Sequence, residues 1–145
     1  MARGVHLFDL LRFLTGSEIS EVRAFSDAPL DRTTAGIALL KDRIPALITT
    51  SKRIPSADNR ITIYGSKARL TLRIFPDREK ATLEIKSAQG TKTHRFSARD
   101  LYIDVLKEFG RSAKRLAQVS DGVAAIQVTE AWRQSARKGK AVRIS

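Results

Sequence analysis

The middle of the chain alternates apolar and polar residues with a period of two, and this pattern limits the fold more than any other feature. In "NRITIYG" and "KARLTLRIF" the apolar side chains recur on every second position, with Gly65 and Ser66 at the joint. Leu70, Leu72 and Ile74 then share one side of a strand, while arginine and threonine share the other. Such strands need one buried face and one polar face, which an antiparallel sheet with helices on a single side provides.

Further strands are predicted on both sides of this pair. The segment "EISEVRAFSD" has the pattern of a short strand, and the turn-rich linker "SDAPLDRT" follows it. The runs "TAGIALLKD" and "PALITTSK", joined by "KDRIP", predict a hairpin, and "ATLEIKS" with "TKTHRFS" predicts another around "AQG". The last residues, "KAVRIS", read as a short final strand.

Helical patterns lie at the two ends of the chain. Residues 4–15 predict a helix that ends at Gly16, a residue suited to the left-handed position after a helix. A second helix is expected to start from Ser97 and Asp100, and a third is expected to start at Ser120 or Asp121 and to stop at Gly139.

These elements predict an α+β fold. Its order is one helix, about six strands and two helices, arranged as a single domain over residues 1–145. The sheet is expected to be open and mainly antiparallel, with helices packed on one face. Trp132 and the phenylalanines at helical spacing are expected in the core.

The chain is strongly basic, with 27 Lys and Arg against 15 Asp and Glu and a net charge of +12. A clustered basic surface would favour nucleic acid, but these residues are scattered along the sequence. The densest group, "RQSARKGKAVR", falls at a helix end, where cations favour the helix dipole. The pattern therefore indicates a solvated surface or one matched to an acidic partner domain more than a nucleic-acid interface.

Composition also limits the compartment and the chemistry. The chain has no cysteine, which excludes disulfides and thiolate metal sites, and cytoplasmic location is the default expectation. No apolar run is long enough for a membrane span, and charged residues interrupt the pattern of a secretory signal. The sequence contains no glycine-rich phosphate loop, paired-histidine metal spacing or serine nucleophile elbow.

His6 is the one candidate for catalysis, because an imidazole can transfer a proton near neutral pH. Asp9 lies one helical turn later and could orient the ring. The spacing alone favours a second interpretation, in which His6 merely occupies the first turn and Asp9 pairs with Arg12 or a free backbone group. The other histidine, His94, is expected at the surface.

Five segments in order resemble one known family. The stretch "GVHLFDLLRFLTGSEISEVRAF" resembles the opening of the C-terminal domain of the Gfo/Idh/MocA oxidoreductases, which includes glucose–fructose oxidoreductase and inositol dehydrogenase. "NRITIYGSKARLTL" is similar to the strand pair of that family, and "YIDVLKEF" is similar to its penultimate helix. "DGVAAIQVTEAWRQSARKGKAVRI" is similar to its closing helix and strand, with Ser135 and Gly139 in place. The resemblance runs from about Gly4 to Ile144.

The resemblance implies the substrate-binding and oligomerising half of a two-domain enzyme, with a fold like the C-terminal domain of glyceraldehyde-3-phosphate dehydrogenase. In that family a Rossmann domain holds NAD or NADP and a lysine of a Glu-Lys-Pro motif. The second domain shapes a sugar or polyol pocket and often builds the oligomer interface. Carried over, His6 falls on the acid/base histidine, Asp9 on a supporting aspartate and Tyr102 on an aromatic substrate-binding position.

Two departures limit what this sequence can do. The first aspartate of the family pattern is replaced by Ala2, and Ala68 stands where the family usually has glycine. The sequence also holds no nucleotide-binding half, so we expect no cofactor in this chain and no hydride transfer by it alone. Whether it is a fragment, the product of a mis-called start or a naturally short protein is left open by the sequence.

Three functions are therefore compared. The first is a substrate-binding and oligomerisation domain that forms a homo-oligomer through the sheet face and partners a Rossmann domain in cis or trans. The second is a non-enzymatic module that self-associates through the polar sheet face or docks an acidic partner. The third, less favoured, is a basic nucleic-acid-binding domain.

Overall fold

The computed structural model describes residues 2–27, 32–53, 59–75, 80–97, 101–111 and 116–144, apart from the side chains of residues 2, 3, 101 and 102. The chain divides into two compact units. The first unit combines both ends of the chain, residues 1–53 and 117–145, and the second contains residues 54–116. The prediction that residues 1–145 act as a single domain stays a prediction.

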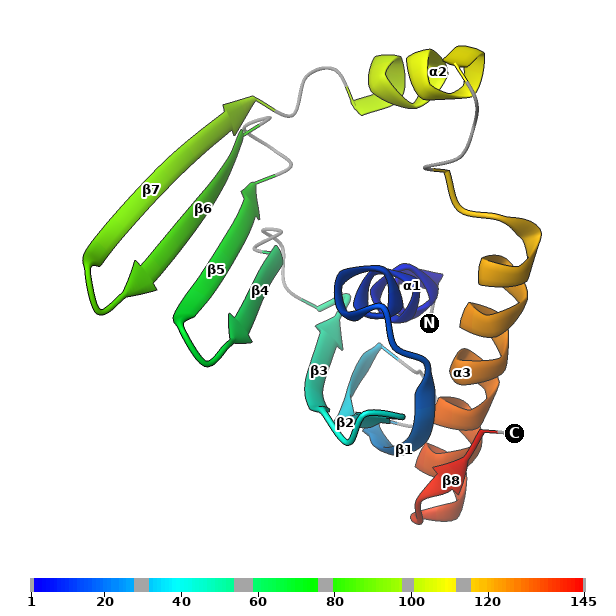
Figure 1. The fold of residues 1–145 in the computed structure, drawn as a ribbon. Helices are drawn as coiled ribbons and strands as arrows, with labels where there is room; N and C mark the ends of the chain where they lie inside the picture. The colour runs from blue at the N-terminus through cyan, green and yellow to red at the C-terminus, as the bar shows by residue number, and fades with distance from the viewer. Residues whose placement is uncertain are drawn as a thin grey trace. The chain divides into compact units, whose positions relative to one another are not determined.

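The elements follow the predicted order closely (Figure 1). The first unit contains α1 (Ala2–Thr15), β1 (Ile19–Ser26), β2 (Thr33–Leu40), β3 (Pro45–Ser51), α3 (Val119–Lys138) and β8 (Val142–Arg143). The second unit contains β4 (Asn59–Tyr64), β5 (Ala68–Phe75), β6 (Lys80–Ser87), β7 (Gly90–Ser97) and α2 (Leu101–Arg111).

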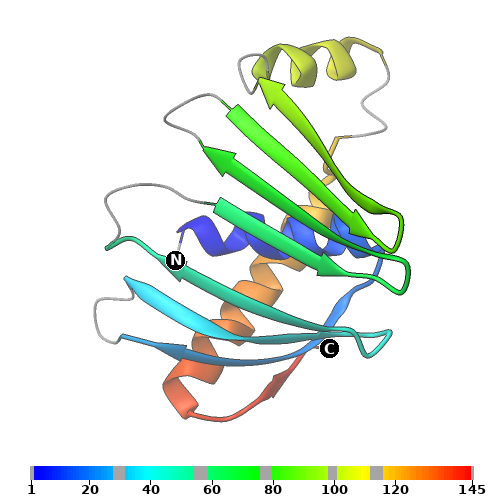
Figure 2. The ribbon, with the colours of Figure 1, turned by 90° about the vertical axis from the view of Figure 1, so that its left-hand side faces the viewer.

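The first unit is a four-stranded antiparallel sheet in the order β3-β2-β1-β8. Both of its helices, α1 and α3, lie on one face of this sheet, and the other face is open (Figure 2). This arrangement follows from the strand pattern, since the buried residues Thr34, Ala38 and Leu40 of β2 are all on even positions, and the odd positions between them are less buried. The expected one-sided covering by helices is therefore confirmed in this unit.

Glycines close both helices of the first unit as expected. Gly16 has φ 64° and its amide donates to the Arg12 carbonyl at 2.8 Å, and Gly139 has φ 65° and donates to the Ser135 carbonyl at 2.9 Å. The start of α3 differs from the expectation by one or two residues. The helix begins at Val119 because Asp121 acts from inside the first turn, where its carboxylate accepts the Gln118 amide at 2.8 Å.

The core of the first unit forms between the helices and the sheet. Its buried members are Phe8, Ile19, Val22, Ala24, Ala38, Leu40, Ile48, Val128 and Trp132. The prediction that Trp132 belongs to the core is confirmed. The same prediction is wrong for Phe13, which is 77% exposed, and for Phe109, which is 71% exposed. Apolar residues at helical spacing share one face of a helix, but the spacing does not show whether another element packs against that face.

Trp132 holds α3 against the sheet. Its indole Nε1 donates a hydrogen bond to Thr34 Oγ1 at 2.8 Å, and its ring lies 5.3 Å from that of Phe8, centroid to centroid. The ring also approaches β2 at Gly36, where a β-carbon would lie 2.7 Å from Trp132 Cη2 and would overlap the Arg23 carbonyl oxygen. Gly36 is thus the position on β2 that lets the indole reach the strand.

Ser135 completes the edge of the same sheet. Its hydroxyl is fully buried, accepts the Ala24 amide at 3.0 Å and donates to the Lys140 carbonyl at 2.6 Å. Strand β8 has only two residues, Val142 and Arg143, which pair with β1 at Val22 and Glu21. The serine therefore supplies a partner for a β1 amide that no residue of β8 pairs with.

Arg12 connects α1 to the turn after it and to the start of α3. Its side chain is only 11% exposed, and it donates two hydrogen bonds of 2.7 Å to the two carboxylate oxygens of Glu18. It also contacts the Asp121 carboxylate at 3.4 Å and the Asp121 carbonyl at 3.3 Å. The hydrogen bonds that Arg12 donates to Glu18 lower the pKa of Glu18 and raise the pKa of Arg12.

The second unit contains a four-stranded antiparallel meander in the order β4-β5-β6-β7. Its register places apolar residues in rows across one face, such as Ile61, Leu72 and Leu83. The other face is polar. Helix α2 carries apolar side chains at helical spacing, but Val105, Leu106 and Phe109 are at least half exposed.

The α+β class and the antiparallel pairing are confirmed, and the strands divide into two sheets of four. Helix α2 begins at Leu101, and Ser97, one of the two residues expected to start it, is instead the last residue of β7. The other, Asp100, and part of the linker "SDAPLDRT" lie outside the described residues. Within the described part of the chain, no helix is long and apolar enough to cross a membrane.

The contact between Trp132 and β2 predicts opposite effects for two glycine-to-alanine substitutions. Gly36→Ala should lower the free energy of unfolding by about 1–3 kcal/mol, since the new methyl group has no space. Gly122→Ala, in α3 with nothing within 4 Å of its would-be β-carbon, should raise it by about 0.5–1 kcal/mol through helix propensity. Urea denaturation measures both, and an equal effect of the two variants would contradict the close packing at Gly36.

The Arg12–Glu18 pair predicts a pH-dependent contribution to stability. Glu18 keeps its charge to lower pH when folded, so the pair stabilises the fold above the ordinary pKa of about 4.5, and this contribution is lost as the pH falls through the lowered folded value. Glu18→Gln should lower the free energy of unfolding by about 1 kcal/mol at pH 7, because the carboxylate is half exposed, and by less at pH 3. Glu130→Gln, which removes an exposed pair with Arg137, is the control and should change little at either pH.

Candidate functional site

His6 lies on α1 with its side chain exposed to solvent. Within the described residues it makes no hydrogen bond or ion pair. At the following turns of the same helical face stand Leu10 and Phe13, and Leu14 is exposed beside them. The imidazole thus projects beside partly exposed apolar side chains, which is typical of a surface that another protein part covers.

Asp9 points to Arg12 rather than to His6. Its carboxylate lies 3.5 Å from Arg12 Nη1, and the structure gives no hydrogen bond or ion pair between Asp9 and His6 among the described residues. The guanidinium is the stronger partner for a carboxylate at this spacing, because it is always charged. Of the two interpretations of the sequence, the Asp9–Arg12 pair is the one present in the structure, and the supporting role of Asp9 stays a prediction.

For two of the three remaining residues of interest, the structure describes the backbone but not the side chain. Tyr102 falls in the first turn of α2, in the second unit, and its side chain lies outside the described residues, as does that of Ala2. His94 is exposed on β7, with its ring 6.5 Å from that of Phe96, as expected for a surface residue. His6 and Asp9 therefore share one helix, whereas Tyr102 belongs to the other unit.

The described residues do not fit a dinucleotide cofactor. All their strand pairs are antiparallel, whereas dinucleotides bind where a glycine-rich loop joins a parallel strand to a helix. Nor do the described side chains include a group of three His, Asp or Glu that could hold a metal ion. Any nicotinamide chemistry would therefore have to be supplied from outside these residues.

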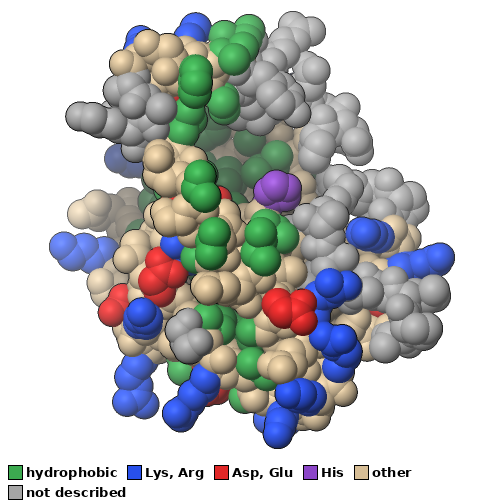
Figure 3. All heavy atoms as spheres, turned by 90° about the vertical axis from the view of Figure 1, so that its right-hand side faces the viewer, with side chains coloured by type: hydrophobic (Ala, Val, Ile, Leu, Met, Phe, Trp, Pro, Cys, Tyr) green, Lys and Arg blue, Asp and Glu red, His purple; other side chains and the backbone are tan. Residues whose placement is uncertain are grey.

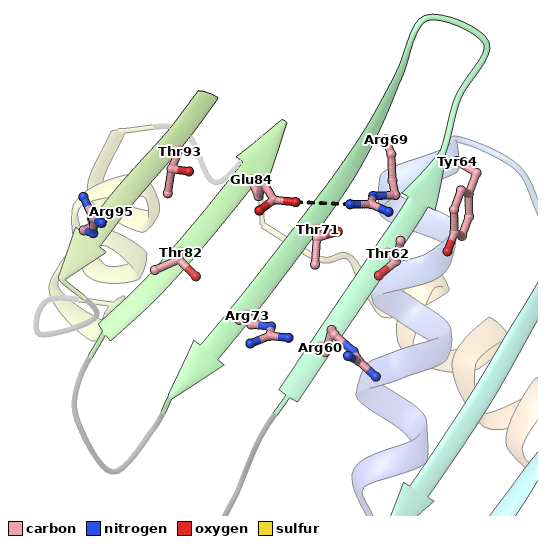
Figure 4. Close-up of a pocket in the computed structure, with 10 residues that line it drawn as sticks. All are labelled: Arg60, Thr62, Tyr64, Arg69, Thr71, Arg73, Thr82, Glu84, Thr93 and Arg95. Atoms are coloured by element: carbon pink, nitrogen blue, oxygen red, sulfur yellow. Dashed lines mark hydrogen bonds and ion pairs between the residues drawn. The ribbon is translucent and has the colours of Figure 1, made fainter. Parts of the chain in front are cut away.

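A hollow on the polar face of the second sheet was not foreseen from the sequence (Figure 4). It measures about 580 Å³ and is lined by four arginines, four threonines, one tyrosine and one glutamate. All these side chains come from β4 to β7. The hollow belongs to the second unit, while His6 belongs to the first.

Register across the strands creates this concentration of arginines. Arg60 on β4 lies opposite Arg73 on β5, Arg73 lies opposite Thr82 on β6, and Thr82 lies opposite Arg95 on β7. These residues are far apart in the sequence, so they form no cluster of basic residues within any short segment. The alternation in "KARLTLRIF" was a usable signal, because it already placed its arginines on the polar side of one strand.

Comparisons with known proteins agree with the fold. The model of the GFO/IDH/MocA C-terminal domain matches residues 1–71 of the chain. The myo-inositol 2-dehydrogenase of Thermotoga maritima is 26% identical over an alignment of 161 positions, which takes in 97% of this chain and 47% of that protein. The chain thus spans about half the length of this curated relative.

Solved structures show the same architecture at low sequence identity. The aldose–aldose oxidoreductase of Caulobacter crescentus superposes with a TM-score of 0.79 at 16% identity, over 97% of this chain and 45% of that one. The UDP-N-acetylglucosamine 3-dehydrogenase of Acidithiobacillus ferrooxidans gives 0.74 at 17% identity, over 93% of this chain and 46% of that one. Both likenesses concern the fold alone.

The family model, the fold and the order of the sequence motifs point the same way. The matched segment begins with α1, which carries His6, and extends into β5. Residues 1–71 of the chain therefore match the Gfo/Idh/MocA C-terminal domain family, and the chain as a whole shares its fold with the sugar oxidoreductases compared above.

Proposed function

We propose that this chain is the substrate-binding and oligomerising half of an NAD(P)-dependent oxidoreductase that acts on a sugar or polyol. The observation that carries the proposal is the family match over residues 1–71, which includes His6 on α1. A relative named as a myo-inositol 2-dehydrogenase, at 26% identity, supports a polyhydroxylated substrate.

In this proposal His6 exchanges a proton with a substrate hydroxyl. An imidazole that makes no hydrogen bond within the described residues is free to accept a proton from an alcohol or to return it. Its place on an apolar surface matters, because covering that surface would exclude water from the proton transfer. Oxidation of an alcohol also requires a hydride acceptor, which a nicotinamide supplies when one is bound elsewhere.

Exposed apolar side chains on the helices support docking of a second protein part. On α3, Val119, Val123 and Ile126 recur at helical spacing and are all more than half exposed. Figure 3, which faces α3, shows hydrophobic side chains open to solvent among charged ones. Surfaces of this kind in a soluble fold commonly mark an interface. We assign this surface, together with the exposed face of α1, to contact with the cofactor-binding half.

The open face of the first sheet supports self-association. Ile37 and Leu47 are neighbours across β2 and β3, Phe25 lies on β1, and all three are exposed. The polar face of the second sheet is less suited to this role, because two copies would bring arginines against arginines. We therefore place the proposed dimer interface on the open face of the β3-β2-β1-β8 sheet.

The catalytic proposal predicts activity only when a cofactor-binding part is supplied. This chain alone, with NAD⁺ or NADP⁺ and myo-inositol, should show no turnover, since its described residues do not fit a dinucleotide. A chimera with the part of the Thermotoga maritima relative that this chain does not cover should oxidise myo-inositol. His6→Gln in that chimera should lower kcat by a factor on the order of 10²–10⁴, which steady-state kinetics measures.

The other histidine provides the matched control for this experiment. His94→Gln removes an exposed imidazole from β7 and should leave kcat unchanged. Turnover by the chain alone would contradict the proposal. So would a His6→Gln chimera as active as its parent.

The dimer proposal predicts different effects for two equally exposed residues. Leu47 is 85% exposed on the open sheet face and Val119 is 86% exposed on α3. Leu47→Glu should convert the dimer to a monomer by placing a charge in an apolar interface, whereas Val119→Glu should leave it a dimer. Light scattering coupled to gel filtration distinguishes the two outcomes. A wild-type chain that stays monomeric at high concentration would refute the proposal.

A further inference from the structure

We infer that the hollow on the polar face of the β4–β7 sheet is a binding site for a phosphate-bearing small molecule. This inference does not rest on the proposed oxidoreductase function, since it concerns residues of the second unit that have no part in it. It is carried by three features of the hollow: an unpaired row of cations, an excess of hydrogen-bond donors and a size that suits a small ligand.

The row of cations consists of Arg60, Arg73 and Arg95. Arg60 and Arg73 are direct cross-strand partners, so their α-carbons lie about 4.5–5.5 Å apart. Like charges directly opposite on a sheet are unfavourable. Figure 4 shows the arginine side chains projecting from one face of the sheet around the hollow. An anion between them would convert this repulsion into charge-assisted hydrogen bonds.

These three arginines have no carboxylate partner among the described residues. Among the described residues that line the hollow, Glu84 has the one carboxylate, and it pairs with Arg69 at 3.3 Å. Arg60, Arg73 and Arg95 make no ion pair or hydrogen bond with any described residue. Their positive charge is thus uncompensated within this part of the structure, and the hollow is a site for an anion.

The donors around the hollow select phosphate. Arginine, threonine and tyrosine side chains all present N–H or O–H groups, and they make up every lining residue except Glu84. A ligand must therefore supply mainly acceptors, and a phosphate group offers several oxygens in a geometry that arginine binds bidentately. A volume of about 580 Å³ is within the range of small-molecule sites, so the ligand can extend beyond a single phosphate.

Two other occupants agree less well with the hollow. Single-stranded nucleic acid is usually held by several stacking aromatic rings, whereas Tyr64 is the one aromatic residue among the described residues that line the hollow. A second copy of the chain would bring its own arginines, with the same sign of charge.

Calorimetric titration of the purified chain with inorganic phosphate and with pyrophosphate tests the site. The wild type should bind both saturably, and pyrophosphate more tightly because it carries more charge. Arg60→Gln/Arg73→Gln should weaken pyrophosphate binding at least about tenfold. Arg133→Gln/Arg137→Gln, on exposed positions of α3, removes the same charge and should leave the affinity within about twofold.

Thermal unfolding provides a second readout that separates ligand binding from misfolding. Without ligand, the Arg60→Gln/Arg73→Gln variant should melt at or above the wild-type temperature, since the substitution removes a repulsive pair. Pyrophosphate should raise the melting temperature of the wild type and of the α3 variant, but not that of the variant in the hollow.

Three results would overturn the inference. The first is a wild type that shows no saturable binding of pyrophosphate at millimolar concentration. The second is binding that both double variants weaken equally, which would indicate attraction by net charge alone. The third is tight, salt-sensitive binding of a single-stranded oligonucleotide that the Arg60→Gln/Arg73→Gln variant loses, without binding of pyrophosphate, which would assign the hollow to nucleic acid.

Discussion

The contact of Trp132 with β2 is the interaction on which the first unit depends. Thr34 accepts the hydrogen bond of the indole from 98 positions away in the sequence, and Gly36 provides the space for the ring. Phe8 of α1 packs against the same ring. One side chain therefore joins the first helix, the sheet and the last helix. This contact also explains how residues at both ends of the chain form one unit while residues 54–116 form another.

Local patterns in the sequence predicted the elements well, because each element is specified by its own residues. Gly16 and Gly139 ended helices at left-handed positions, and alternation identified both hairpins. The division into two sheets was not predictable in this way. The alternation of apolar and polar residues indicates which side chains share one face of a strand, but it does not indicate which strands pair outside a hairpin. The exposure of Phe13 and Phe109 was unpredictable for a similar reason. Helical spacing shows which apolar side chains share one face of a helix, but not whether another element packs against that face.

The candidate sites show the same limit at the level of single side chains. Asp9 is spaced one turn from both His6 and Arg12, and spacing alone favoured a partner other than His6, either Arg12 or a free backbone group, without identifying which. The structure decides for Arg12, whose guanidinium already contacts Glu18 and Asp121 and holds its position through them. The arginines of the hollow could not be predicted as a cluster, because no short segment of the sequence contains them all. They are distant in sequence, and only the register of β4 to β7 brings them into one row.

The two sheets present surfaces of different character, and this difference limits what each can bind. The open face of the first sheet carries apolar side chains, for which burial against a flat apolar partner is favourable whatever its detailed chemistry. The polar face of the second sheet carries unpaired arginines, for which burial without an anion is costly. Contact with a second copy of this chain would bury the apolar side chains of the first sheet favourably, whereas at the second sheet it would bring arginines against arginines. The proposed self-association and the proposed anion binding are therefore assigned to different sheets, so each can be tested by substitution without changing the residues of the other.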